Sequence, residues 1–136
     1  MDKVTAKDKT AAKNKVTAGK DALGDFAPQF AHLNDEVLFG EVWSREDKLS
    51  PRDRSIITIT ALLTSGIFDS SFSFHLKKAK ENGVTKTEIA EILTQLAFYS
   101  GWPKAWSAFR LAKEIWSEGT SVRSEERRVG KECRSR

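Results

Sequence analysis

The chain has 136 residues, with 23 Lys and Arg against 19 Asp and Glu, and it contains four Trp, eight Phe and one Cys. This length supports one small domain. No apolar run approaches the roughly 20 residues needed to cross a bilayer, and the N-terminus lacks the apolar core of a signal peptide, so we expect a soluble, cytoplasmic protein with no membrane partner.

The C-terminal segment 123–136 reads RSEERRVGKECRSR, has no apolar period and holds the single cysteine, Cys133. It resembles the translation of a sequencing adapter, and we interpret it as an artefact within a disordered tail over residues 120–136. The alternative is a basic extension that contacts nucleic acid. However, six basic and three acidic residues lie in this segment, so residues 1–122 carry 17 basic and 16 acidic groups. We therefore expect no nucleic-acid partner.

The first 21 residues contain six Lys and three Asp but almost no large apolar side chains. They cannot bury much surface, so residues 1–26 are predicted to be a lysine-rich extension that forms a frayed helix. The main domain is then expected to span residues 27–119. Pro28 opens a short segment through Asn34, and residues 37–43 have the pattern of a short amphipathic helix.

The next helix is predicted to begin at Ser50-Pro51, where a capping hydroxyl precedes a proline at the first helical position, and to stop at Gly66. A second helix begins at Asp69 or Ser70. Apolar residues and His75 share one of its faces, and Asn82-Gly83 ends it in a left-handed residue.

Thr85-x-x-Glu88 is a capping box that predicts the start of a further helix. Gly101-Trp102-Pro103 breaks this helix, and a final helix is expected to run to about Trp116. No alternating strand pattern is evident, so the sequence predicts an all-α protein of about six helices. The aromatic content is high for a small domain, which favours burial of some aromatic side chains in a homo-oligomer.

Several of these segments occur in an order typical of one family. They are Leu49-Ser-Pro-Arg-Asp-Arg-Ser55, Phe74-His75-Leu76, Asn82-Gly-Val-Thr85, Glu88-Ile-Ala-Glu91 and Tyr99-x-Gly-Trp-Pro103. From about Ala27 to about Trp116 the chain resembles the carboxymuconolactone decarboxylase family, which has the alkyl hydroperoxidase D-like helical fold. The resemblance implies a homotrimer or a homohexamer and makes His75 the proton donor or acceptor. Judged from its apolar stripe alone, His75 also fits a core histidine.

The related alkyl hydroperoxidase D branch uses Cys-x-x-Cys-x-x-x-His. The positions seven and four before His75 are Phe68 and Ser71, which cannot cycle a disulfide. An antioxidant activity is therefore disfavoured.

Decarboxylation of a carboxylated lactone requires a group that holds carboxylate, a donor to the developing oxyanion and a proton source. Arg54 is predicted to bind the carboxylate, or alternatively to form a salt bridge with Asp53, Asp69 or Glu88. Tyr99 is predicted to donate to the oxyanion. Such a reaction needs neither a metal nor an organic cofactor, and none is predicted.

Three further residues, Ser71, Gln95 and Trp102, are predicted to contact the substrate; the alternative for Trp102 is packing. Gln95 departs from the family pattern, because relatives often carry a histidine at this position. An amide cannot exchange a proton near neutral pH. The sequence therefore favours a cofactor-free lyase that acts on a small carboxylated lactone or a related intermediate of aromatic catabolism. The alternative is a non-catalytic oligomer that binds a small molecule.

Overall fold

The computed structural model describes residues 15–118. The predictions for residues 1–14 and for the tail from residue 119, including Cys133, lie outside this range. Six α-helices and one π-helix are found among the described residues, with no strand, which confirms the all-α prediction. The chain divides into two compact units at Ser50 and Pro51, inside the span that the sequence predicts as one domain.

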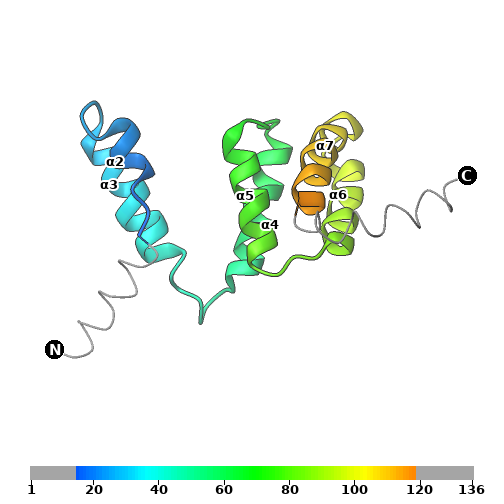
Figure 1. Cartoon of the computed structure of the whole chain (residues 1–136), viewed down its shortest axis with the longest axis horizontal. Helices are drawn as coiled ribbons and strands as arrows, with labels where there is room; N and C mark the ends of the chain where they lie inside the picture. Colours follow the sequence, from blue (N-terminus) through cyan, green and yellow to red (C-terminus); the bar gives the residue numbers. More distant parts are fainter. Residues whose placement is uncertain (1–14, 119–136) are drawn as a thin grey trace, which may run out of the picture. The chain divides into compact units, whose positions relative to one another are not determined.

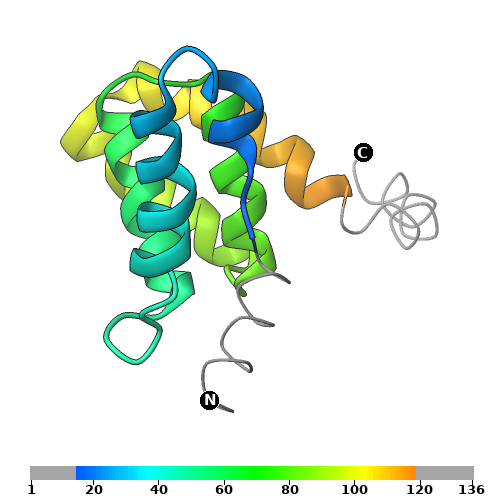
Figure 2. The ribbon, with the colours of Figure 1, turned by 90° about the vertical axis from the view of Figure 1, so that its left-hand side faces the viewer.

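The first unit contains α2 (Ala18–Leu23), α3 (Pro28–His32) and the π-helix η1 (Leu33–Val42), which follows α3 directly. Figure 2 shows α2 beside the longer column that α3 and η1 form. The buried Asp35 of η1 accepts hydrogen bonds from the backbone N–H groups of Gly19 (2.8 Å) and Lys20 (2.9 Å), so it caps the start of α2. The helix α2 thus packs against α3 and η1 within this unit.

The contact between Asp35 and α2 explains two neighbouring residues, Gly19 and Asn34. A Cβ atom on Gly19 would lie 2.7 Å from Oδ1 of Asp35, so only glycine permits the close approach. The side-chain amide of Asn34 also donates to Asp35, and this bond, together with those from Lys20 and Gly19, lowers the pKa of the carboxyl.

The second unit contains α4 (Pro51–Thr64), α5 (Ser70–Glu81), α6 (Lys86–Ser100) and α7 (Trp102–Glu118). Figure 1 shows α4 beside α5 and α6 beside α7, and these two pairs have the closest packing within the unit. One buried core joins all four helices. Its members are Ile59, Leu63, Phe72, Leu76, Ala79, Val84, Ile89, Leu93, Leu96, Ala108, Ala112, Ile115 and Trp116.

The predicted helix ends in this unit are confirmed. Asp69 caps α5 through a 3.0 Å bond from the N–H of Ser71, and Thr85 with Glu88 forms the capping box of α6. Gly66, Gly83 and Gly101 follow α4, α5 and α6 with φ of 76°, 101° and 122°, a region that favours glycine.

Side-chain bonds fix how the helices align. Ser55 of α4 meets Asn82 at the end of α5, so these helices are antiparallel. Arg52 and Glu88 pair at the starts of α4 and α6. The hydroxyls of Thr64 and Ser100 are 2.8 Å apart at the ends of the same two helices. These helices are therefore parallel. Lys80 donates to the carbonyl of Ile115, which sets α5 parallel to α7.

Candidate active site

His75 lies in the middle of α5 and is half-buried, with its Nδ1 atom buried. The ring of the exposed Phe74 packs edge-on against the imidazole at 4.9 Å between centroids. Burial, and to a lesser degree the positive charge of Lys78, lower the pKa of His75 from its usual value of 6.5. The neutral imidazole therefore predominates at neutral pH, and its conjugate acid is a stronger proton donor than a free imidazolium.

The partners of Asn82 show which way His75 faces. Asn82 follows His75 by seven residues, about two helical turns, so both lie on one side of α5. Asn82 donates to Ser55 of α4, whereas Lys80 bonds to α7 on the other side. His75 is therefore on the α4 side of α5. His75 is seven residues before Asn82 on α5. Because the helices are antiparallel, it lies opposite the residue seven positions after Ser55 on α4, which is Leu62.

Arg54 is half-buried in the first turn of α4. It is eight residues from Leu62, so along the helix axis its backbone lies about 12 Å from the level of His75. Glu88 of α6 pairs with Arg52, and this hydrogen bond lowers the pKa of the Glu88 carboxyl.

Ser71 lies one turn before His75 on α5, and its hydroxyl is 2.6 Å from Oδ1 of Asp69. This bond is part of the N-terminal cap of α5, so the Ser71 hydroxyl stabilises the start of the helix. Phe68 packs edge-on against Phe72 at 5.1 Å between ring centroids. The two positions that hold cysteines in the thiol-dependent branch thus serve packing and capping.

Gln95 and Tyr99 lie on α6. They follow Glu88 by seven and eleven residues, so they share the side of α6 on which Glu88 meets Arg52. The parallel alignment of α4 and α6 places them level with residues 59 and 63 of α4, close to the height of His75. Both are exposed, with 83% of Tyr99 accessible.

Trp102 lines an apolar cavity of about 240 Å³ between α6 and α7. The other lining residues are Thr94, Ala97, Ala105, Trp106 and Phe109. The predicted contact residue Trp102 therefore lies at a cavity. The space depends on two alanines, Ala97 and Ala105, where α6 and α7 face each other, and these were not among the predicted site residues.

Comparison with known proteins identifies the family of this chain. Residues 28–114 match the family model described as the carboxymuconolactone decarboxylase family. The chain belongs to the carboxymuconolactone decarboxylase family. The match includes α3, η1 and all but the last residues of α7, so it covers His75, Arg54 and the α6–α7 cavity.

Two relatives are similar over most of this region. A 4-carboxymuconolactone decarboxylase from Acinetobacter baylyi is 35% identical over 96 residues, covering 71% of this chain and 70% of the relative. An uncharacterized 15.0 kDa protein from the nqo9-nqo10 intergenic region of Paracoccus denitrificans is 30% identical over 84 residues, covering 61% of this chain and 62% of the relative.

Two features are absent from the part of the chain that the structure describes. No group of three or more His, Cys, Asp or Glu residues between residues 15 and 118 is arranged to hold a metal ion. No helix in the same range is both long enough and apolar enough to cross a membrane.

Proposed function

We propose that this chain is a cofactor-free carboxy-lyase that decarboxylates a small carboxylated lactone or a related intermediate of aromatic catabolism. The family match and the name of the Acinetobacter baylyi relative support the reaction class. The observation that carries the chemistry is the half-buried imidazole of His75 in the middle of α5, with its lowered pKa.

The reaction balances without redox chemistry. The bond between the ring carbon and the carboxylate breaks, its electron pair passes toward the lactone carbonyl, and carbon dioxide leaves. The imidazolium form of His75 then donates a proton to the dienolate, and solvent restores that proton. Arg54 holds the carboxylate, since a guanidinium matches its two oxygens, and its long side chain reduces the axial separation from His75.

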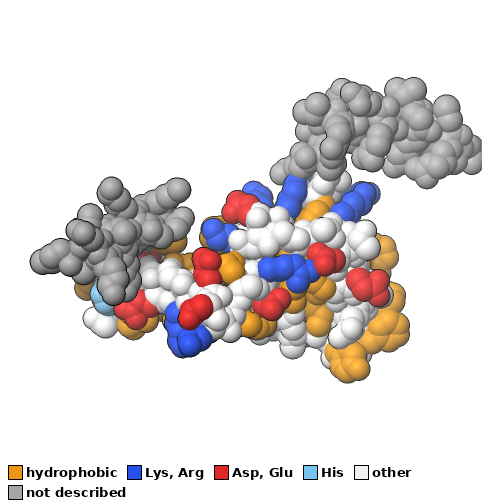
Figure 3. All heavy atoms as spheres, turned by 90° about the horizontal axis from the view of Figure 1, so that it is seen from below, with side chains coloured by type: hydrophobic (Ala, Val, Ile, Leu, Met, Phe, Trp, Pro, Cys, Tyr) orange, Lys and Arg blue, Asp and Glu red, His pale blue; other side chains and the backbone are white. Residues whose placement is uncertain are grey.

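Assembly is part of this proposal. Phe98 and Tyr99 are 76% and 83% accessible in a single chain, and Trp102 and Trp106 are also exposed. Figure 3 shows exposed hydrophobic side chains gathered at the end of the second unit that α6 and α7 form. A homotrimer or homohexamer would cover such surface. It would also allow Tyr99 and Gln95 to meet a substrate that His75 of another copy protonates.

One observation favours a second candidate, a non-catalytic oligomer that binds a small molecule. Gln95 has no titratable proton near neutral pH, and it is exposed on α6. A family member that has lost a proton-exchanging group there retains the grooves of the fold without turnover.

The experiment that separates these candidates is an assay with 4-carboxymuconolactone in the absence of metal and reductant. Loss of the lactone with stoichiometric release of carbon dioxide supports the lyase. Saturable binding of the lactone without carbon dioxide supports the binding protein. A parallel assay with an organic hydroperoxide and a dithiol tests the antioxidant alternative, and turnover that depends on the dithiol would overturn the proposal.

A further inference from the structure

The cavity between α6 and α7 does not include His75 or Arg54, since its lining comes from α6 and α7 alone. Ala97 and Ala105 are buried and form its floor, whereas Trp102 and Trp106 are partly exposed and form its walls. Phe98 packs edge-on against Trp102 at 5.5 Å between ring centroids, which extends the aromatic wall toward solvent.

The volume limits what the cavity can hold. At about 240 Å³ it exceeds the roughly 150 Å³ of an apolar cavity that binds benzene, but it is smaller than the roughly 300 Å³ at which sites for drug-sized ligands begin. It therefore accommodates one ring with a short substituent.

The chemistry of the walls favours a flat, apolar ring. Two indoles and the phenyl ring of Phe109 offer aromatic faces and edges. Thr94 is the single lining residue with a hydroxyl, and that hydroxyl donates to the carbonyl of Ala90 at 2.7 Å. The cavity interior thus provides little for a polyhydroxylated or zwitterionic ligand.

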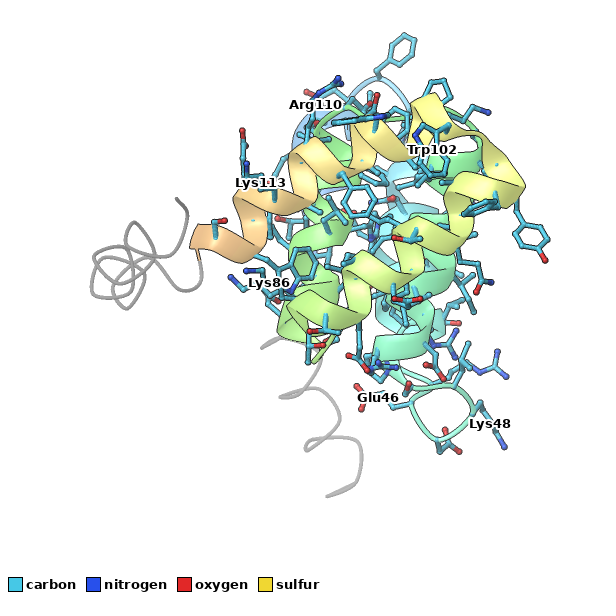
Figure 4. The ribbon with its side chains drawn as sticks, turned by 90° about the vertical axis from the view of Figure 1, so that its right-hand side faces the viewer. Glu46, Lys48, Lys86, Trp102, Arg110 and Lys113 are labelled. Carbon is cyan, nitrogen blue, oxygen red and sulfur yellow. The ribbon has the colours of Figure 1, made fainter. Side chains whose placement is uncertain are left out.

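A positive charge stands at the edge of this cavity. The guanidinium carbon of Arg110 lies 5.5 Å from the ring centroid of Trp106, stacked over the indole that forms one wall. Stacking keeps the N–H groups of Arg110 in their own plane and available at the rim. Figure 4 shows Trp102, Arg110 and Lys113 following one another along α7.

The neighbouring charges leave Arg110 as the relevant cation. Glu91 on α6 and Lys113 on α7 lie further from the α6–α7 turn than Thr94 and Phe109, at similar heights on facing helices. Their opposite charges offset one another. Arg110 is adjacent to Phe109 and stacks on Trp106, both of which line the cavity.

We propose that the α6–α7 cavity is a binding site for a monocyclic aromatic carboxylate, with the ring between Trp102 and Trp106 and the carboxylate at Arg110. This site does not depend on the proposed lyase activity, because neither His75 nor Arg54 lines it. Charge complementarity at the rim distinguishes this ligand from a neutral ring, and the concave alanine floor distinguishes it from a flat contact with a second copy.

The test measures binding of benzoate to the full chain by titration calorimetry and tryptophan fluorescence, with benzyl alcohol as the neutral ligand of similar size. Arg110→Gln should weaken benzoate binding about fivefold, the scale of a solvent-exposed ion pair, and leave benzyl alcohol binding unchanged. Lys86→Gln is the matched control, because it removes one positive charge at the far end of α6 (Figure 4). It should change neither affinity.

A second variant tests the cavity itself. Ala105→Leu should abolish binding of both ligands by filling the space, whereas Ala90→Leu adds the same atoms on the exposed side of α6 and should not. If Ala105→Leu does not fold, the variants Arg110→Gln and Lys86→Gln still decide the test, because both side chains are exposed.

Three results would overturn the proposal. One is the absence of a saturable benzoate signal up to about 10 mM, beyond the weak end of specific affinities. Another is equal weakening by Arg110→Gln and Lys86→Gln. The third is a signal that appears only when light scattering shows a change of oligomeric state, which would assign the surface to a second copy of the chain.

Discussion

The side-chain amide of Asn82 donates a 3.0 Å hydrogen bond to the hydroxyl of Ser55, and this contact aligns α5 with α4. Ser55 is fully buried, so its hydroxyl depends on protein partners. The same alignment places His75 opposite Leu62 and two helical turns from Arg54. A bond at one end of the helix pair therefore determines which residues can face a substrate near its middle.

Asn82→Ala should lower the free energy of unfolding by about 1–2 kcal/mol, because it removes the donor to a buried hydroxyl. Urea denaturation is the measurement. The Ser55→Ala, Asn82→Ala double variant should lose less than the sum of the single losses. Glu81→Ala, at the exposed neighbouring position, should stay within about 0.5 kcal/mol of the parent. Strict additivity would show that the two side chains are not coupled.

His75→Asn should lower kcat for decarboxylation about 100-fold or more while the protein stays folded, since an amide of similar size cannot donate the titrating proton. Circular dichroism and thermal denaturation check the fold. Wild-type turnover by this variant would remove His75 from the mechanism.

The pH dependence has a defined direction. A proton donor must be in its imidazolium form, and burial holds the pKa of His75 below 6.5. The value of kcat/KM should therefore fall as pH rises through a midpoint below 6.5, because that parameter reports the free enzyme. The same lowered pKa makes the unfolded chain bind more protons between the folded pKa and 6.5, so His75 favours the folded state more as pH rises through that window. A rate that rises with pH there would make His75 a base instead.

Arg54→Lys should raise KM for the lactone with a smaller effect on kcat, because the charge remains but the two-pronged contact with a carboxylate is lost. Arg52→Lys is the matched control two residues earlier. Arg52 pairs with Glu88, so its replacement should alter stability slightly and leave KM unchanged. Equal changes in KM for both variants would indicate a general effect of the α4 N-terminus.

Local signals in the sequence predicted the second unit well. Asp69, the Thr85–Glu88 capping box and the glycines after α4 and α5 act within a few residues, so their outcome does not depend on the rest of the fold. The packing of residues 15–26 was not predictable in this way, because it depends on Asp35, sixteen residues beyond Gly19, reaching back to cap α2.

For the candidate site, the sequence predicted residue types but not how those residues are arranged in space. His75 has the half-buried position that its apolar stripe indicates. The sequence could not show the register that places His75 opposite Leu62, since it depends on the antiparallel packing of α4 and α5. The pairing of Arg52 with Glu88 likewise depends on helix rotation, which periodicity alone does not fix.

The assembly can be tested at the exposed aromatic surface. The protein should be a trimer or hexamer by light scattering at micromolar concentration, because Phe98 and Tyr99 are otherwise left in water. Phe98→Asp should shift it toward a monomer, since a charge buried in an interface without a partner is costly. Thr87→Asp, on the same exposed side of α6 but away from the aromatic residues, is the control. A native monomer in the parent protein would remove the oligomer from the proposal.

Gln95→His restores a titratable group to α6, and its effect depends on which proposed function is correct. If the glutamine marks divergence from a decarboxylase that used a second proton-exchanging residue, Gln95→His should raise kcat for the lactone, by about tenfold if the added group contributes at the low end of acid–base catalysis. Glu91→His places the same side chain one turn earlier on the exposed side of α6 and should not raise it. Carbon dioxide release measures both variants. Absence of turnover in the parent protein and in Gln95→His, with the lactone still bound, would favour the binding protein over the lyase.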